Sequence, residues 1–289
     1  MSSAELAAPA PAWRAWLQLA RISNTPTVAS NAVAGAVLAS TAAEVGTVVP
    51  VAIAMAVFYT AGMVLNDVLD EQIDRVERPE RPIPSGVVSR QAAIAAVAAL
   101  FVIGEALLLV AGLEPFLAGL GLVALIVLYD AWHKGNALSP VLMGGCRALV
   151  YVVAALAVAE SVALEVWTAA AVLLLYIVGL TQVAKAEGGG LLAAWPLAAV
   201  LAAIGYWVGW VTSVWFVLLL VVFAAWVVRA LWLVRVPRRI GAGVVSLIAG
   251  VSLFDALAVA SVDGSVAAVA VCLAAFLATI ALQTKIAGT

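Results

Sequence analysis

The feature that most constrains the fold of this chain is an almost unbroken succession of long apolar segments. They lie near residues 22–39, 49–69, 92–111, 115–131, 138–159, 166–184, 191–210, 214–234, 240–260 and 265–282. A membrane core about 30 Å thick needs roughly 20 apolar residues for one helical span. Only 10% of the 289 residues are charged and 66% are hydrophobic, so a water-soluble fold could not cover its apolar surface. The sequence predicts an all-α polytopic membrane protein with about ten spans.

Charged residues divide between the two sides of such a bundle. Connecting the segments in order puts a set of basic residues on one side: Arg14, Arg21, Arg75, Arg78, Arg81, Arg90, Lys134, Lys185, Arg235, Arg238, Arg239 and Lys285. The connections on the opposite side carry acids without Lys or Arg: Glu44, Glu114, Glu160, Glu165 and Asp263. Positive charge marks the cytoplasmic side of membrane proteins. We therefore expect a multi-pass protein of the plasma (inner) membrane with a cytoplasmic amino terminus.

Several classes of function and partner are excluded or not indicated. The net charge of −2 and the absence of a basic patch argue against nucleic acid as a partner. Cys146 and Cys272 lie in apolar segments without metal-binding spacing, so they predict small core residues rather than a disulfide or zinc site. Residues 1–12 lack the features of a cleaved signal peptide. No feature indicates an obligate protein partner.

The second apolar segment ends in a run of acids, NDVLDEQID, from Asn66 to Asp74. On a helix Asn66, Asp70 and Asp74 recur every four residues and share one face, with Asp67 and Glu71 beside them. Aligned carboxylates repel one another unless a cation binds them, and Mg²⁺ prefers oxygen ligands completed by water and phosphate. The alternative is that these acids solvate a helix end or pair with the arginines that follow.

The residues after this run place cations beside the acids. The stretch RVERPERPIPSG covers residues 75–86, and its prolines end the helix and hold Arg78 and Arg81 in a rigid loop. Binding groups for a cation and for an anion are thus close together. The combination predicts a site for a metal-bound diphosphate.

The string NDVLDEQIDRVERPERPIPSG resembles the first aspartate motif of the UbiA superfamily, NDxxDxxxD, with the Arg-Pro-rich loop that follows it. The resemblance covers essentially the whole chain as one domain, residues 1–289. It implies a bundle of nine, possibly ten, transmembrane helices around a lipid-open cavity with a cytoplasmic active site. It also implies an enzyme that uses Mg²⁺ to transfer an isoprenoid chain from a prenyl diphosphate to a lipophilic or aromatic acceptor. The residues that match the motif as metal ligands are Asn66, Asp67, Asp70 and Asp74, with Asp70 and Asp74 catalytic.

Other positions match the family less specifically and are expected to bind substrate. Arg21 and Asn24 resemble the start of the family's first helix, and on a continuous helix they would share a face with Asn31. Tyr129 and Lys134 resemble the family's tyrosine and diphosphate-binding lysine, although the positive-inside bias explains Lys134 equally well. The expected substrate-binding set is completed by Arg78, Arg81 and Gln182.

The chain departs from the family at the second aspartate motif. The corresponding residues 181–190 read TQVAKAEGGG, which contains no aspartate. Glu187 is the remaining carboxylate for a metal, and Lys185 stands where a ligand is expected. Either the Lys185 ammonium replaces a second cation as a catalytic group, or it pairs with Asp70 or Asp74 and closes a site without turnover. The pattern resembles the EboC-like, UbiA-like branch.

Other functions and membrane charges stay open. A non-catalytic protein that binds or transports a prenylated lipid is the main alternative. A CDP-alcohol phosphotransferase is a distant alternative, because this chain lacks the glycine-and-arginine pattern of that motif around its aspartates. A transporter of ions or sugars is not excluded, but its site would usually lie nearer the membrane midplane. Glu105 and Asp255 are functional candidates because they lie within apolar segments, but both are expected outside the active site. Arg147 could snorkel to the boundary or reach the cavity.

Overall fold

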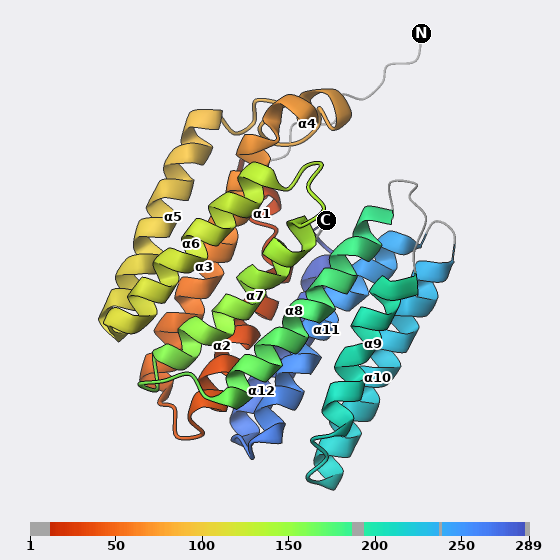
Figure 1. The fold of residues 1–289 in the computed structure, drawn as a ribbon. Coiled ribbons are helices and arrows are strands. Elements are labelled where there is room, and N and C mark those ends of the chain that lie inside the picture. The colour runs from red at the N-terminus through yellow and green to blue at the C-terminus, as the bar shows by residue number, and fades with distance from the viewer. Residues whose placement is uncertain (1–11, 187–193, 237–238, 287–289) are drawn as a thin grey trace.

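The computed structural model describes residues 12–186, 194–236 and 239–286 as a helical bundle (Figure 1). Each predicted apolar segment contains one helix. They are α2 (Thr25–Ala39), α3 (Val45–Leu69), α5 (Arg90–Ala111), α6 (Leu113–Trp132), α7 (Ser139–Leu156), α8 (Leu164–Lys185), α9 (Ala194–Val208), α10 (Val214–Arg235), α11 (Ile240–Ser261) and α12 (Val266–Gln283). Short helices complete the described chain: α1 (Ala12–Leu19), the 3₁₀ helix η1 (Ile22–Asn24) and α4 (Glu71–Glu77). The all-helical prediction is confirmed.

Helix length separates the membrane-spanning candidates from the rest. Within the described ranges, 8 helices are long and apolar enough to cross a membrane: α3, α5, α6, α7, α8, α10, α11 and α12. Helices α2 and α9 have only 15 residues each, and α2 also carries buried polar residues. The chain is therefore a multi-pass membrane protein.

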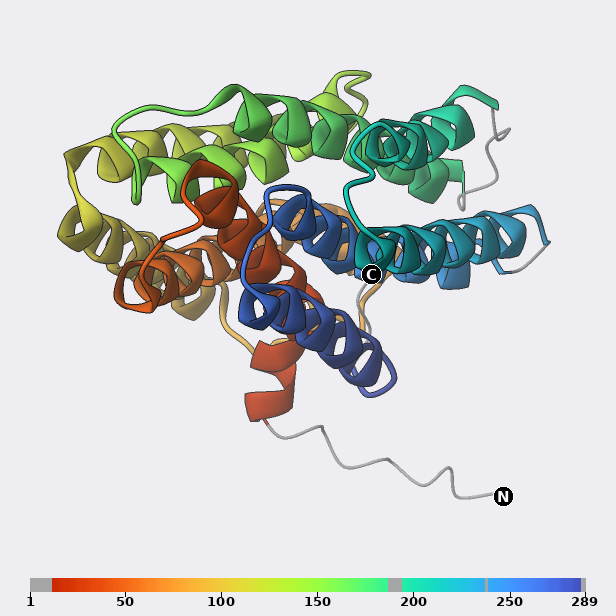
Figure 2. The ribbon, with the colours of Figure 1, turned by 90° about the horizontal axis from the view of Figure 1, so that it is seen from below.

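Helix α2 occupies the centre of the arrangement. It packs against α3 and α7 on one side and against α11 and α12 on the other, although the last two are far away in sequence. Seen from below, α2 lies between the group formed by α3, α5 and α6 and the C-terminal helices (Figure 2). Helices from both ends of the chain thus surround one central element.

Close helix contacts depend on glycine at two positions of this centre. A Cβ at Gly35 of α2 would lie 2.5 Å from the carbonyl oxygen of Tyr151 in α7. A Cβ at Gly144 of α7 would lie 2.8 Å from the carbonyl oxygen of Leu174 in α8. Small residues let membrane helices approach to backbone contact. These glycines fix α7 between α2 and α8.

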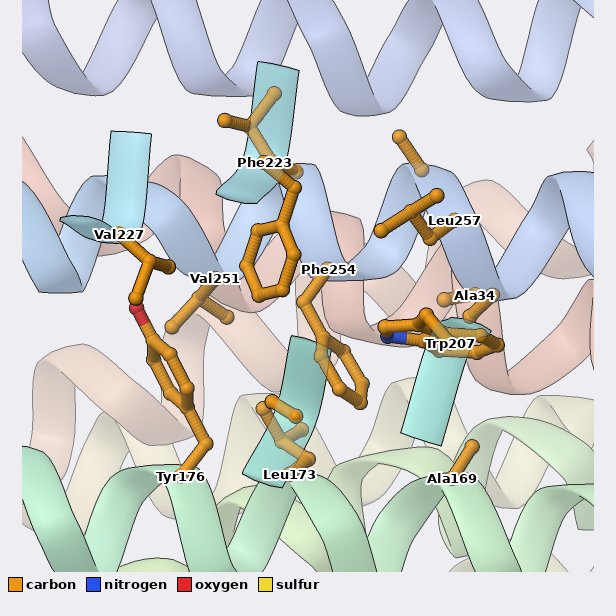
Figure 3. Close-up of a cluster of buried hydrophobic side chains, with 14 of the residues drawn as sticks. Ala34, Ala169, Leu173, Tyr176, Trp207, Phe223, Val227, Val251, Phe254 and Leu257 are labelled. Atoms are coloured by element: carbon orange, nitrogen blue, oxygen red, sulfur yellow. The ribbon is translucent and has the colours of Figure 1, made fainter. Parts of the chain in front are cut away.

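The C-terminal helices enclose a core of aromatic side chains, shown in Figure 3. The rings of Trp207 and Phe254 meet edge to face with their centroids 5.1 Å apart, and Phe223 packs edge to face against Phe254 at 6.3 Å. Tyr176 satisfies its hydroxyl by donating to the carbonyl oxygen of Leu247 at 2.8 Å. This part of the bundle is filled by its own side chains.

Candidate active site

The acidic run continues the face of α3 into α4. Helical hydrogen bonds cross the junction, from the Asp70 amide to Asn66 and from the Asp74 amide to Asp70, both at 2.9 Å. The predicted spacing of four residues is therefore kept, and Asn66, Asp67, Asp70 and Asp74 are all buried. Glu71 also is buried, but its carboxylate pairs with two exposed arginines outside this face. The acidic run thus contributes the Asn66 side-chain amide and the carboxylates of the three aspartates to one site.

Basic side chains from two other segments neutralise these carboxylates. Arg81 binds Asp74 at 2.7 Å and Asp67 at 3.1 Å, and Arg21 lies 3.4 Å from Asp67. The loop after α4 therefore places its arginine beside the acids, as the sequence predicts. In this structure the acids pair with a following arginine, which was the alternative to a bound metal.

The third carboxylate, Asp70, is bound by the loop after α6. Lys134 Nζ lies 2.9 Å from Asp70 Oδ1, and His133 Nε2 lies 3.4 Å from Asp70 Oδ2. Burial acts to raise the pKa of Asp70, but the hydrogen bonds from His133 and Lys134 outweigh it and lower the pKa below its ordinary value. The hydrogen bond to Asp70 in turn raises the pKa of His133. The sequence assigned no role to His133, because a single histidine at a membrane edge gives no signal of its partner.

The donor set agrees in chemistry with a hard divalent cation. Asn66 and the three aspartates offer amide and carboxylate oxygens, which Mg²⁺ prefers. In the described part of the chain, however, no group of three or more His, Cys, Asp or Glu side chains lies close enough to hold a metal ion. Arg81 and Lys134 bind oxygens that a metal would take, so metal binding requires these ion pairs to exchange. Glu187, the remaining predicted ligand, lies outside the described residues.

A cavity of about 360 Å³ begins beside this polar cluster. Residues expected to bind substrate contribute to its wall: Arg21, Asn24, Arg78, Arg81 and Tyr129. Much of the remaining wall is apolar and includes Val28, Met55, Phe58, Leu122, Ile126 and Ile177. The cavity therefore joins a cationic region to a hydrophobic chamber.

The remaining predicted substrate residues lie differently. Lys134 binds Asp70 and, like Gln182, is not a cavity-lining residue, whereas Thr181 and Ala184 of α8 do line the cavity. Lys185 Nζ lies 2.7 Å from Ser139 Oγ. Among the described residues, Lys185 makes no ion pair with the aspartates. The pairing of Lys185 with Asp70 or Asp74, one of the two alternatives for this residue, is thus absent from the described structure.

Two expectations from the sequence require correction. Arg21 has a left-handed backbone with φ 41° and precedes α2, so it does not belong to a continuous helical face with Asn31. Asn31 instead donates to Asp255 at 2.8 Å, while Arg21 and Asn24 line the cavity. Cys146 lines the cavity rather than serving only as a core residue.

Two further cavity residues come from α6 and α7: the sequence reasoning missed Asp130, and it left open whether Arg147 reaches the cavity. Asp130 is 3% exposed and accepts a hydrogen bond from Asn66 at 3.2 Å. Arg147 reaches the cavity and donates to Asn31 and Thr27. Asp130 lies between Tyr129 and Lys134, two residues that were identified from the sequence, and this position was the one signal that could have indicated it. The hydrogen-bond partners of Arg147 are remote in sequence, so no local pattern indicated them.

The two acids expected outside the site differ from each other. Glu105 of α5 packs near Gly119 of α6, and in the described chain neither carboxylate oxygen has a hydrogen-bond partner. Neither Glu105 nor Asp255 lines the cavity, as expected. Asp255, however, reaches the cavity wall indirectly through Asn31 and Arg147.

Comparisons with known proteins find similar sequences. Digeranylgeranylglyceryl phosphate synthase of Methanoregula boonei is 35% identical over 125 residues, 43% of this chain and 44% of the relative. The Methanopyrus kandleri synthase is 33% identical over 139 residues, 46% of this chain and 51% of the relative. The chain therefore matches about half the length of these curated relatives.

Solved structures share the fold over most of the chain. A UbiA homolog from Archaeoglobus fulgidus bound to GPP and Mg²⁺ has a TM-score of 0.61 and 14% identity, covering 86% of this chain and 99% of that one. A UbiA homolog from Aeropyrum pernix K1 has a TM-score of 0.57 and 20% identity, covering 89% and 95%. The model of the UbiA prenyltransferase family matches residues 28–242. This chain belongs to the UbiA prenyltransferase family.

Proposed function

We propose that this protein transfers an isoprenoid chain from a prenyl diphosphate to a lipophilic or aromatic acceptor in a Mg²⁺-dependent reaction. The observation that carries the proposal is the distribution of charge in the cavity. Arg21, Arg78 and Arg81 line its wall, Arg21 and Arg81 contact carboxylates of α3 and α4, and much of the remaining wall is apolar. A donor with a diphosphate head and a hydrocarbon tail is complementary to this distribution.

The residues divide the work of the transfer between them. Bound at Asn66, Asp67, Asp70 and Asp74, Mg²⁺ would neutralise the charge that develops on the diphosphate leaving group. Arg78 and Arg81 would bind diphosphate oxygens, since guanidinium groups match phosphate geometry. The bond from the allylic carbon to the diphosphate oxygen breaks, the acceptor's nucleophilic atom bonds to that carbon, and the acceptor loses its proton. The apolar wall excludes water that would otherwise capture the allylic cation.

The comparisons support the donor and the metal in this proposal. The relatives are named digeranylgeranylglyceryl phosphate synthases, and the Archaeoglobus fulgidus homolog was solved with GPP and Mg²⁺. Lys134 supports it as well, because a metal on Asp70 would release its ammonium towards a phosphate oxygen.

Lys185 takes the place of the second metal cluster in the proposal. Its ammonium contacts neutral partners, Ser139 Oγ at 2.7 Å and the Asn136 carbonyl oxygen at 3.5 Å. The neighbouring Ala184 lines the cavity. A cation that no carboxylate neutralises in the described chain is available to a diphosphate.

The direct test incubates purified protein with Mg²⁺ and labelled prenyl diphosphates of several chain lengths, and measures binding and diphosphate release. Binding with release that depends on an added acceptor is the expected result. Binding without release over a range of acceptors would favour the non-catalytic lipid-binding alternative. Failure to bind any prenyl diphosphate would contradict both.

We further propose that the site faces the cytoplasm from the plasma membrane, as the positive-inside distribution of charge indicates. Reagents that cannot cross the membrane should label a cysteine placed at Glu114 or Asp263 in intact cells. They should not label a cysteine placed at Ser85. The reverse labelling pattern would contradict this orientation.

A further inference from the structure

An arginine on α10, a helix at the edge of the bundle (Figure 1), lies well before the end of its helix. Arg229 is exposed, as are Val222 and Trp232, which stand seven residues before it and three residues after it and so share its helical face. Arg229 precedes the last residue of α10 by six residues, about 9 Å along the axis. A helix of 22 residues is about 33 Å long, slightly more than the hydrocarbon core of a bilayer. The α-carbon of Arg229 therefore lies within the hydrocarbon.

The side chain of Arg229 stays at this depth instead of extending to the helix end. Its guanidinium carbon lies 5.0 Å from the centroid of the Trp226 ring, and Trp226 precedes Arg229 by three residues, towards the interior of the span. One guanidinium nitrogen donates to Ser246 Oγ at 3.4 Å. Ser246 lies six residues after the start of α11, so it is as far from this end of the bundle as Arg229. Arginines near helix ends usually extend to the membrane boundary, and this one is held below it.

Contacts from two further helices fix the Trp226 ring beside the guanidinium. Trp226 Nε1 donates to the Ser246 carbonyl oxygen at 2.7 Å, and the ring meets that of Phe276 in α12 edge to face with their centroids 4.8 Å apart. Ser246 Oγ donates to the Ala242 carbonyl oxygen at 2.8 Å, so it serves Arg229 as an acceptor. An arginine over a fixed aromatic ring is stabilised by the electrons of that ring. The guanidinium thus lies on a surface built from α10, α11 and α12.

No acid neutralises Arg229 in the part of the chain that the structure describes. Residues 214–289 contain two acids, Asp255 and Asp263. Asp255 is fully buried and accepts hydrogen bonds from side chains of α2 and α7, and Asp263 lies beyond the opposite end of α11. The contact with Ser246 is the one hydrogen bond that the guanidinium makes among the described residues, although an arginine carries several more donors. An unpaired charge in hydrocarbon is costly, so an anion from the surroundings is needed.

Further basic residues lie at the same end of the C-terminal helices. Arg235 ends α10, Arg239 precedes α11 and Lys285 follows α12. All three are exposed, and none of them makes an ion pair with another described residue. Arg81 differs, because it binds two carboxylates beside the cavity. The positive charge above Arg229 is thus free to attract an anion to the membrane boundary.

We propose that Arg229 binds the phosphate of an anionic phospholipid, whose acyl chains lie along the exposed apolar face of α10. The phosphate accepts from the guanidinium donors that have no partner in the described chain, and the Trp226 ring holds these donors in place. The headgroup reaches this depth because a bilayer thins locally around a charge. Basic pockets between membrane helices bind anionic headgroups in this way. Neither Arg229 nor Trp226 lines the cavity, so this site is separate from the proposed transfer reaction.

The test titrates delipidated protein in detergent with phosphatidylglycerol or with phosphatidylcholine of the same acyl chains. Native mass spectrometry measures the dissociation constant of each lipid for wild type, Arg229→Gln and Arg229→Lys. Arg14→Gln is the matched control, because Arg14 also lies over a tryptophan ring, 5.3 Å from the centroid of Trp13, but on α1. Inorganic phosphate is added as a competitor, which separates a lipid site from a site for free phosphate.

Wild type should bind phosphatidylglycerol about tenfold to a hundredfold more tightly than phosphatidylcholine, whose own cation competes for the phosphate. Arg229→Gln should remove this preference, and Arg14→Gln should retain it. Inorganic phosphate should not displace the lipid, since the acyl chains contribute to its binding. If Arg229→Gln does not fold, Arg229→Lys carries the test: it should keep a reduced preference, because an ammonium retains the charge but loses the planar donors.

Three results would overturn the assignment. The two lipids bind wild type equally, or Arg14→Gln lowers the preference as much as Arg229→Gln does, or inorganic phosphate displaces phosphatidylglycerol. The second result would assign the preference to net charge alone, and the third would assign the site to free phosphate. An Arg229→Lys variant with the full wild-type preference would contradict the role of the planar guanidinium on the Trp226 ring.

Discussion

Helices α3 and α8 both contribute residues to the cavity wall, but the charged groups at the ends of the two helices are opposite in sign. The end of α3 and the following α4 supply three carboxylates, each in contact with basic side chains from other segments. The end of α8 supplies Lys185, whose ammonium contacts a hydroxyl and a carbonyl oxygen. The connection from α6 to the start of α7 joins the two ends. Its Lys134 binds Asp70, and Asn136 and the first α7 residue, Ser139, bind Lys185. The site is thus asymmetric in charge, with the carboxylates that we propose as metal ligands on one side and the Lys185 ammonium on the other.

The largest expected effect comes from removing charge at the α3 end. Asp70→Asn and Asp74→Asn should each reduce Mg²⁺-dependent diphosphate release by about 100-fold or more, since each removes a ligand that stabilises the leaving group. Each also removes an ion pair, that of Lys134 with Asp70 or one of the two that Arg81 makes, so the free energy of unfolding should fall by about 1–3 kcal/mol. Release assays and chemical unfolding measure the two effects. Glu71→Gln, an acid of the same run outside the site, should retain release; equal loss there would contradict the assignment.

A smaller effect is expected at the α8 end. Lys185→Ala should weaken prenyl diphosphate binding about tenfold to a hundredfold at saturating Mg²⁺, because a charge-assisted contact is lost. The affinity for Mg²⁺ alone should stay unchanged, since Lys185 does not contact the aspartates. Calorimetric titration with each ligand measures both constants. A rise in Mg²⁺ affinity would instead restore the hypothesis that Lys185 pairs with the aspartates.

Two arginines near the acidic run differ in burial: Arg75 lies in α4 and Arg81 in the loop that follows it. Arg81 bridges Asp67 and Asp74 with a side chain 18% exposed, whereas Arg75 binds Glu71 with a side chain 65% exposed. In the absence of Mg²⁺, Arg81→Met should lower the free energy of unfolding by about 1–2 kcal/mol, and Arg75→Met by less than about 0.5 kcal/mol. Equal losses in denaturant titrations would show that burial does not strengthen the pairs.

The smallest effect concerns the pH dependence of the contact between His133 and Asp70. The raised pKa of His133 means that its contribution is complete below the ordinary value of 6.5 and is lost as pH rises through the folded value. The lowered pKa of Asp70 means that its contribution is present above 3.8 and is lost as pH falls through its folded value. Metal-free protein should therefore gain most from the pair between about pH 4 and 6.5. His133→Gln should flatten the decline in stability above that range; an unchanged profile would exclude the contact.

Local sequence rules predicted the parts of the site that depend on neighbours in the chain. The spacing of Asn66, Asp70 and Asp74 placed them on one helical face, and the prolines after Glu77 placed Arg81 beside them. The same rules failed for Asn31, because Arg21 departs from helical geometry before α2 begins. A pattern predicts a shared face only while the helix continues.

The sequence by itself determined that this protein lies in a bilayer and which segments form helices. Long apolar segments with few charges require helices in a bilayer, since only internal hydrogen bonding satisfies the backbone there. The acidic run and the arginine loop were equally visible, because their residues are close in sequence. Their resemblance to the UbiA motif was confirmed by the family match over residues 28–242.

Only the tertiary structure decided which charges meet. Asn66 and Asp130 are 64 residues apart, Asn31 and Arg147 are 116 apart, and Asn31 and Asp255 are 224 apart. Helical periodicity gives the face on which a side chain lies, but the partner on that face is set by how the helices pack. Glycine contacts at Gly35 and Gly144 bring α2, α7 and α8 together. That packing puts Arg147 and Asp130 on the wall of one cavity, because the three-dimensional approach of helices is not encoded in any local spacing.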